Sequence, residues 1–181
     1  DVQNIPAWRE VPLKRILEAR YQVPVYINND ANCFAVGEKY FCLGRSYNNF
    51  VGLIIGTGLG AGLIINGRLY SGPNCGAGEF GMLPYLKANF ERYASGQFFL
   101  KSYDCPGKEF YQRAKAGQEE ALKVFKEYGH HLGEAIKAIM YALDPEAIIL
   151  GGSVSQSYEF FKDSMLAAIS TFAYSLALKR I

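Results

Sequence analysis

The stretch FVGLIIGTGLGAGLIINGRLY, residues 50–70, decides the fold. Phe50 to Gly56 is an apolar run with several β-branched residues, and it predicts a strand. Ala61 to Gly67 predicts a second strand for the same reason. Asn66-Gly67 is a strong hairpin signal, because a type I′ turn needs positive φ at both central positions. Arg68 to Tyr70 should therefore return as the partner strand.

The glycine-rich loop GTGLGAG, Gly56 to Gly62, lies between these strands. It matches the G-x-G-x-x-A fingerprint of dinucleotide sites, but that fingerprint requires a helix to begin inside the motif. Leu63 to Gly67 instead predicts a strand and a turn, which argues against a dinucleotide site. A loop between strands suits phosphate, since glycine lets successive N–H groups point at an anion and the Thr57 hydroxyl adds a donor. The alternative is a tight hairpin that needs glycine only for its geometry.

Strand and helix patterns flank this region. Val23 to Ile27 suits a short buried strand, and Ala147 to Leu150 suits another that ends in Gly151-Gly152. Strands that alternate with helices and group beside them indicate an α/β fold. Apolar spacing predicts a helix after Val11-Pro12 and further helices over residues 31–43, 91–100, 108–116, 118–143 and 158–178.

Composition excludes several classes of protein. The chain has 181 residues, of which 50% are hydrophobic and 20% charged, so it should fold. A net charge of +2 gives no reason to expect a nucleic-acid or anionic-membrane surface. No apolar run approaches the roughly 20 residues of a membrane helix, and we see no signal peptide. The cysteines form no CxxC pair, so we expect free thiols in a reducing cytoplasm rather than zinc ligands. They are Cys33, Cys42, Cys75 and Cys105.

Asn29-Asp30 stands at the end of an expected buried strand and the start of a helix. Strand ends of this kind are where α/β folds bind ligands. A carboxylate there could accept a proton from a substrate hydroxyl. The alternative is ordinary capping of the helix, although two adjacent Asx residues exceed what one cap needs.

Three further positions are candidates. Glu79 is a lone carboxylate in the glycine-rich sequence CGAGEFG, where small neighbours let backbone or ligand pack against it. Glu91 opens an expected helix, where the helix dipole alone would favour an acid. Gly151-Gly152 would let a flat ligand lie against backbone, or would simply make a tight turn.

Taken in order along the chain, these motifs resemble the ROK family of sugar kinases and transcriptional repressors. That family belongs to the actin/hexokinase-like ATPase superfamily. The resemblance implies a ribonuclease H-like α/β lobe with a mixed sheet and flanking helices. It covers nearly the whole chain through NIPAWREVPLKRILE, INNDANCFAVGE, GLIIGTGLGAGLIINGRLYSGPNCGAGEFG, ERYASG and PEAIILGGSVS.

The resemblance also implies a role for each matching residue. Asp30 matches the catalytic base, which takes the proton of the sugar hydroxyl. Asn29, Glu79 and Glu91 match residues that bind the sugar. The implied cofactors are ATP and Mg²⁺. The nucleotide would lie against the second phosphate motif, Gly56, Thr57 and Gly58, and the adenosine motif, Gly151 and Gly152.

The sequence departs from the family pattern after Glu79. Met82 stands where the family usually has a histidine, and no cysteine lies between Leu83 and Phe90. The usual zinc-binding loop is therefore absent, and we expect no zinc, because a thioether binds this metal poorly. We expect apolar packing to fill its place, with Tyr85 and Leu86 as candidates. Ser153 replaces a third glycine of the adenosine motif, a minor change.

The resemblance further suggests how the chain is organised. Residues 1–28 would end the segment that joins an N-terminal lobe. Residues 29–181 would form the C-terminal lobe, which binds sugar and ATP, with the final helix packing toward the other lobe. The first phosphate motif, D-x-G-x-T, is not in these 181 residues, so we expect this chain alone to be inactive.

The expected function is therefore the C-terminal part of an ATP-dependent, glucokinase-like kinase that phosphorylates a hexose or an N-acetylhexosamine. One alternative is the effector domain of a sugar-responsive repressor. Another is a non-catalytic sugar-binding or oligomerisation module. We expect a cytoplasmic homodimer without a membrane partner, and nucleic acid as a partner only if a helix-turn-helix domain lies upstream. The dimer is suggested by family habit and by aromatic residues that could equally be core: Tyr93, Phe98, Phe99, Tyr103, Phe110, Tyr111, Phe125 and Tyr128.

Overall fold

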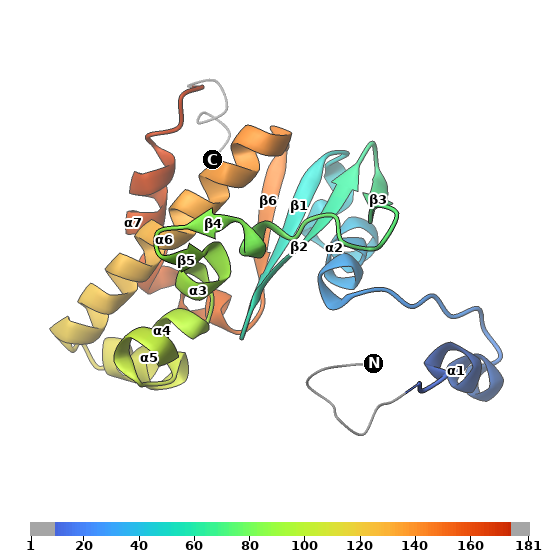
Figure 1. The fold of residues 1–181 in the computed structure, drawn as a ribbon, viewed down its shortest axis with the longest axis horizontal. Coiled ribbons are helices and arrows are strands. Elements are labelled where there is room, and N and C mark those ends of the chain that lie inside the picture. Colours follow the sequence, from blue (N-terminus) through green and yellow to red (C-terminus); the bar gives the residue numbers. More distant parts are fainter. Residues whose placement is uncertain (1–9, 175–181) are drawn as a thin grey trace.

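A computed structural model describes residues 10–174 of the chain (Figure 1). Its central sheet has the strand order β3-β2-β1-β6. β1 runs antiparallel to β2 and parallel to β6, so the sheet is mixed and the predicted α/β class is confirmed. A separate hairpin pairs β4 with β5. The strands are β1 Phe50–Ile55, β2 Leu59–Ile65, β3 Arg68–Tyr70, β4 Pro84–Tyr85, β5 Ala88–Asn89 and β6 Ala147–Gly151.

The predicted hairpin between β2 and β3 is confirmed. Asn66 and Gly67 have φ values of 52° and 75°, which is the type I′ pattern. Beyond the turn, Ile65 pairs with Arg68.

Helices flank the sheet on both sides. α2 covers one face, while α6 and α7 lie on the other (Figure 1). α1 lies apart from the body of the molecule and buries none of its residues. The α-helices are α1 Leu13–Tyr21, α2 Asp30–Phe41, α3 Phe90–Ala94, α4 Gln97–Tyr103, α5 Gly107–Lys115, α6 Glu119–Leu143 and α7 Tyr158–Ile169. Short 3₁₀ turns are η1 Leu43–Ser46, η2 Phe80–Met82 and η3 Val154–Ser157.

Alternation along β1 and β2 separates the two faces of the sheet. Odd-numbered residues such as Leu53 and Ile55 are fully buried in the core shared with α6. Glycines take the even positions Gly52, Gly60 and Gly62, and they let the start of α2 lie directly on the sheet. A side chain at Gly62 would collide with the Ala31 carbonyl. The period of two along these strands therefore brings Asp30 next to the glycine-rich hairpin.

The aromatic helices form the core. The rings of Phe99, Phe125 and Tyr128 are fully buried, and Phe99 lies 5.2 Å from Phe125 and 5.0 Å from Tyr128 between centroids. Phe98 and Phe110 are buried with them. These five residues act as core and give no support to a dimer interface. Tyr93 and Tyr111 are half-buried and Tyr103 is 38% exposed, and the homodimer stays a prediction.

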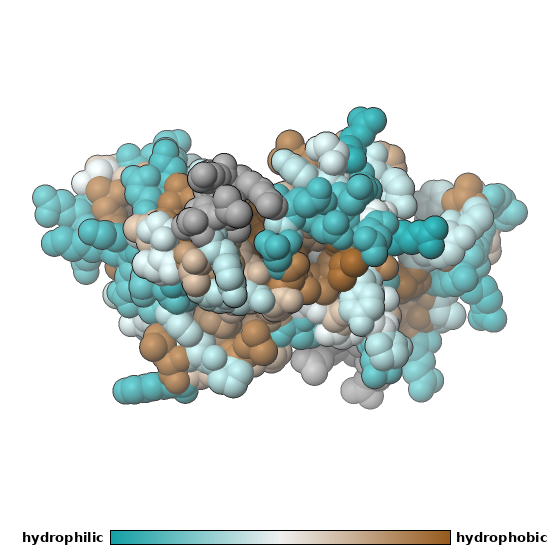
Figure 2. Space-filling view, turned by 90° about the horizontal axis from the view of Figure 1, so that it is seen from above, coloured by the Kyte–Doolittle hydropathy of each residue, from teal (hydrophilic) through white to brown (hydrophobic). Residues whose placement is uncertain are grey.

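The expected strand at Val23 to Ile27 is wrong. This segment has no regular secondary structure and pairs with no strand among the described residues, and Val23 and Ile27 are both 54% exposed. An apolar run forms a stable strand only beside a neighbour that supplies hydrogen bonds and a packing face. Apolar residues also reach the surface elsewhere, and Figure 2 shows them lying between hydrophilic side chains.

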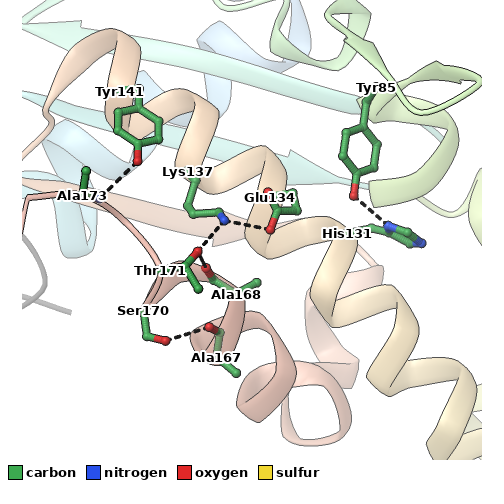
Figure 3. Close-up of polar contacts among 10 residues, drawn as sticks. All are labelled: Tyr85, His131, Glu134, Lys137, Tyr141, Ala167, Ala168, Ser170, Thr171 and Ala173. Atoms are coloured by element: carbon green, nitrogen blue, oxygen red, sulfur yellow. Dashed lines mark hydrogen bonds and ion pairs between the residues drawn. The ribbon is translucent and has the colours of Figure 1, made fainter.

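The final helix is shorter than expected. α7 ends at Ile169, where Ser170 and Thr171 turn their hydroxyls back onto the carbonyls of Ala167 and Ala168 (Figure 3). Lys137 of α6 also donates to the Thr171 hydroxyl at 2.7 Å. These contacts fix the chain where it leaves the helix. Residues 175–178 of the expected helix lie outside the described residues, and its packing toward another lobe stays a prediction.

Candidate functional site

The segments that carry the candidate carboxylates pack along β2. The Ala31 carbonyl, one residue after Asp30, lies against Gly62. Gly78, one residue before Glu79, lies against the carbonyl of Ala61. The structure thus brings to one strand a segment about 30 residues before it and another about 17 residues after it, as expected where glycine lets backbones approach closely.

The sequence left open whether Asn29 and Asp30 cap the helix or serve a ligand, and the structure gives them different positions. Asn29 caps α2, because its Oδ1 accepts from the N–H of Asn32 at 2.7 Å. Its Nδ2 donates to the Cys75 carbonyl at 3.2 Å, which joins the cap to the loop that carries Glu79. Asp30 is exposed, and its Oδ1 accepts from the N–H of Ala31 at 2.9 Å. The cap is complete without Asp30, so this carboxylate is available for other chemistry.

Asn28 and Asn32 support the cap and were missed from the sequence. Asn28 Oδ1 accepts from the N–H of Asn29 and from Asn32 Nδ2, both at 2.9 Å. Asn32 is fully buried, which is uncommon for an amide; its Nδ2 is bonded to Asn28, whereas its Oδ1 has no hydrogen-bond partner among the described residues. The signal that could have found it is a polar residue between Ala31 and Ala35 on the buried face of the helix.

Glu79 is exposed between Gly78 and the 3₁₀ turn η2. Gly78 has a φ of 95°, and a side chain there would collide with the Ala61 carbonyl. Gly81 is similarly close to the Leu59 carbonyl. Small neighbours hold this loop against β2, as the sequence predicted, and leave the carboxylate of Glu79 facing solvent.

Glu91 is half-buried and already bonded to protein. Its Oε2 accepts from the N–H of Leu59 at 3.1 Å, and its Oε1 accepts from Gln97 Nε2 at 2.8 Å. The cap of α3 is Asn89, whose Oδ1 accepts from Arg92 N–H at 2.9 Å. A carboxylate offers about four lone-pair sites, so Glu91 retains capacity for a ligand hydroxyl.

Ser95 and Gly96, which were expected to lie inside one helix, instead contact the loop at Gly56 to Gly58. The expected helix over residues 91–100 is broken at Ser95-Gly96. Gly96 N–H donates to the Gly56 carbonyl at 2.8 Å, and Ser95 Oγ lies 3.0 Å from the Thr57 carbonyl oxygen. These contacts with the loop override helical periodicity, and Ser95 is a site residue that periodicity alone does not reveal.

The loop and the Gly151-Gly152 turn lie at one edge of the sheet. β1 and β6 are parallel, so the residues that follow them emerge side by side. Gly152 has a φ of 89°, and a side chain there would collide with the carbonyl of Ile55, the last residue of β1. Gly152 is therefore required by close approach as well as by backbone conformation.

A cavity of about 480 Å³ opens beside this edge. Gly56 and Thr57 line it on one side and the residues after Gly152 on another. α4 and α5 supply apolar walls, and Lys108 is the single charged residue among the described residues that line it. The full lining is Gly56, Thr57, Gly96, Gln97, Phe99, Leu100, Pro106, Gly107, Lys108, Tyr111, Gln112, Phe125, Ser153, Val154, Gln156 and Ser157. Gly58, Gly151 and Gly152 lie outside this lining.

The segment after Glu79 forms the β4–β5 hairpin. Tyr85 is half-buried and packs on Phe90, as expected for a residue that fills this space. Leu86 is 65% exposed at the hairpin turn, so its expected packing role is wrong. Met82 is also exposed.

Cysteine and metal-ligand side chains are dispersed. Cys33, Cys42 and Cys75 are exposed, Cys105 is buried, and all four are free thiols. Within residues 10–174, no three His, Cys, Asp or Glu side chains are grouped to hold a metal ion. No helix in that range is both long and apolar enough to cross a membrane.

Comparison with known proteins gives matches along nearly the whole chain. The model of the ROK family matches residues 1–180. A xylose repressor of Bacillus subtilis is 32% identical over 93% of this chain and 48% of its own length. An N-acetyl-D-glucosamine kinase of Pectobacterium carotovorum is 34% identical over 88% of this chain and 61% of its own length. The chain thus spans about half to three fifths of these relatives.

A solved structure shares the fold. The ROK family glucokinase from Streptomyces griseus, in complex with glucose and AMPPNP, superposes with a TM-score of 0.77 and 28% identity. The match covers 91% of this chain and 64% of that one.

Proposed function

Because the chain belongs to the ROK family, we propose that it is the C-terminal part of an ATP-dependent kinase for a hexose or an N-acetylhexosamine. One observation carries the proposal. The loop after β1 and the turn after β6 meet at one sheet edge beside a cavity, and Asp30 lies across the same hairpin. Ligands of α/β folds bind at such an edge, and glycine-rich turns there suit phosphate.

The lining of the cavity is compatible with ATP. Leu100 and Tyr111 offer apolar and aromatic surface for a base, and Lys108 supplies positive charge. The Thr57 side chain is exposed, and the space beside the Gly56 Cα is open. Kinase sites hold Mg²⁺ with one or two carboxylates together with substrate phosphates, so they need no three-carboxylate cluster. When bound, Mg²⁺ would neutralise charge on the phosphates.

The sugar would lie among Asn29, Asp30, Glu79 and Glu91, since carboxylates and amides bind vicinal hydroxyls. We assign Asp30 as the general base. Its carboxylate takes the proton from a sugar hydroxyl while that oxygen bonds to the γ-phosphorus, and the bond to ADP breaks. The exposure of Asp30 and its dispensability for the cap support this role.

The test is a coupled assay with ATP and Mg²⁺ on the full-length protein over a panel of hexoses and N-acetylhexosamines. Asp30→Asn should lower kcat about 10²- to 10⁴-fold, the usual contribution of a positioned general base. Asp163→Asn makes the same change at an exposed position of α7 and should leave kcat unchanged. Turnover by Asp30→Asn close to wild type would remove the base assignment.

A second function is favoured by the 32% identity to the Bacillus subtilis xylose repressor. A repressor would use the same sugar residues as a sensor and would need no base. In that case the wild type turns over no sugar, and sugar binding measured by calorimetry survives Asp30→Asn. The sequence upstream also separates the two, because a helix-turn-helix indicates a repressor and D-x-G-x-T indicates a kinase.

A further inference from the structure

We propose that Tyr85, through its hydrogen bond to His131, sets the position of Glu91 and with it the affinity for sugar. The proposal deepens the proposed function and rests on it for the sugar. Its structural half concerns only how the β4–β5 hairpin is fastened to α6, and it can be measured without any sugar.

The hairpin leads directly into the helix that carries Glu91. Asn89 is both the last residue of β5 and the cap of α3, and Glu91 stands in the first turn of that helix. Phe90 N–H donates to the Leu83 carbonyl at 3.1 Å, which closes the base of the hairpin. With no linker in between, a movement of the hairpin is a movement of Glu91.

Two of the contacts that Tyr85 makes carry the argument, beside edge-on ring contacts with Tyr93 and His131. Its ring stacks on Phe90, with centroids 4.5 Å apart and planes at 18°. Its hydroxyl lies 3.0 Å from His131 Nδ1 on α6, across the space between hairpin and helix (Figure 3). The ring contact ties the hairpin to α3, and the hydroxyl ties both to α6, the longest helix of the described chain.

The protonation of the pair favours a Tyr85 donor and a His131 acceptor. The His131 side chain is only 11% exposed, and this burial lowers its pKa, so the ring is neutral near pH 7. We assign its proton to Nε2, which faces Glu127 Oε1 at 3.8 Å, and this leaves Nδ1 to accept. Burial, with Glu134 nearby, raises the pKa of Tyr85 to about 12, so the hydroxyl keeps its proton.

The two ends of α3 are fastened independently. At its C-terminal end, the buried Tyr128 hydroxyl donates to the Ala94 carbonyl at 3.1 Å. At its N-terminal end the fastening runs through Tyr85 and Phe90. Loss of the Tyr85 hydroxyl therefore frees the end where Glu91 reaches Leu59, and leaves the other end in place.

The experiment compares Tyr85→Phe with Tyr103→Phe in the full-length protein. Both variants lose one tyrosine hydroxyl that bonds to α6, since Tyr103 donates to Glu127 Oε2 at 2.7 Å. Tyr103 lies at the C-terminal end of α4, at the opposite end of that helix from Gln97, the α4 residue that bonds to Glu91. Tyr85→Phe should raise the KM for sugar about 5-fold, the worth of a hydrogen bond. The KM for ATP and the melting temperature of Tyr85→Phe should equal those of Tyr103→Phe.

The second readout is amide hydrogen exchange at Leu59, whose N–H is bonded to Glu91. Tyr85→Phe should speed exchange at Leu59 and leave Gly96, which is bonded to Gly56, unchanged. Equal Leu59 exchange in the two variants overturns the proposal whatever the sugar does. If the wild type binds no sugar, the proposed function fails, and faster Leu59 exchange in Tyr85→Phe alone still supports the positioning role.

Discussion

The carboxylate of Glu91 accepts a hydrogen bond at 3.1 Å from the backbone N–H of Leu59, the first residue of β2. β2 begins directly after the glycine loop at residues 56–58. The residue proposed to bind sugar is thus bonded to the strand that follows the loop proposed to bind phosphate.

Glu91 should matter for folding as well as for sugar. Glu91→Ala removes the partner of a buried N–H, so we expect a loss of about 1–3 kcal/mol in the free energy of unfolding. Glu79→Ala changes an exposed carboxylate and should stay within about 0.5 kcal/mol. Urea unfolding without sugar measures both. Equal stabilities of the two variants would show that the Leu59 bond contributes nothing.

The sequence predicts elements whose partners are near in the chain. The β1–β2–β3 hairpins follow from apolar runs rich in β-branched residues and from Asn66-Gly67, and α6 follows from helical spacing of apolar residues. Those signals are local, and the tertiary contacts are compatible with the structure that each one favours. The same applies to the cap at Asn29, because the N–H that it accepts from belongs to Asn32, three residues later.

Features that depend on distant partners were not predictable. The residues of Val23 to Ile27 do not reveal whether a neighbouring strand is present. The break at Ser95-Gly96 depends on the carbonyls of Gly56 and Thr57, about 40 residues earlier. The role of His131 likewise appears only when the Tyr85 hydroxyl lies 3.0 Å away.

The four thiols should differ in reactivity. Cys33, Cys42 and Cys75 are exposed, whereas Cys105 is buried, and burial raises the pKa of its thiol. With an aromatic disulfide reagent at pH 7, we expect three fast thiols in the native protein and the fourth only after unfolding in guanidinium. Four fast thiols in the native protein would place Cys105 at the surface.

Glu146 should make stability depend on pH in the acid range. Hydrogen bonds from the N–H groups of Asn49, at 2.6 Å, and Asn48, at 2.7 Å, lower the pKa of its carboxyl. The unfolded chain then binds the proton more readily, so the stabilisation is present above the ordinary glutamate pKa of about 4.3. It is lost as pH falls through the lower folded pKa.

The measurement is the melting temperature between pH 7 and pH 3. Glu146→Gln should show a smaller fall with acid than wild type, because the amide has no proton to take up. Glu159→Gln, at an exposed glutamate of α7, serves as the matched change of charge. Parallel curves for wild type and Glu146→Gln would contradict the assignment.

Three glycines should separate close packing from ligand space. Gly152→Ala forces a side chain into the Ile55 carbonyl at a φ of 89°, and the left-handed backbone alone costs about 1–2 kcal/mol. Gly37→Ala, inside α2 with open space around it, should raise stability by about 0.5–1 kcal/mol. Gly56→Ala meets no atom within 4 Å, so its stability should stay near wild type.

The discriminating result is at Gly56, which lines the cavity proposed for the nucleotide. Its new methyl group should enter that space and raise the KM for ATP several-fold without changing unfolding by urea. Gly152→Ala should instead lose stability and ATP affinity together, since a shift at Ile55 displaces the loop that follows β1. If Gly56→Ala binds ATP as wild type does, the phosphates do not lie beside Gly56, and another part of the loop binds them.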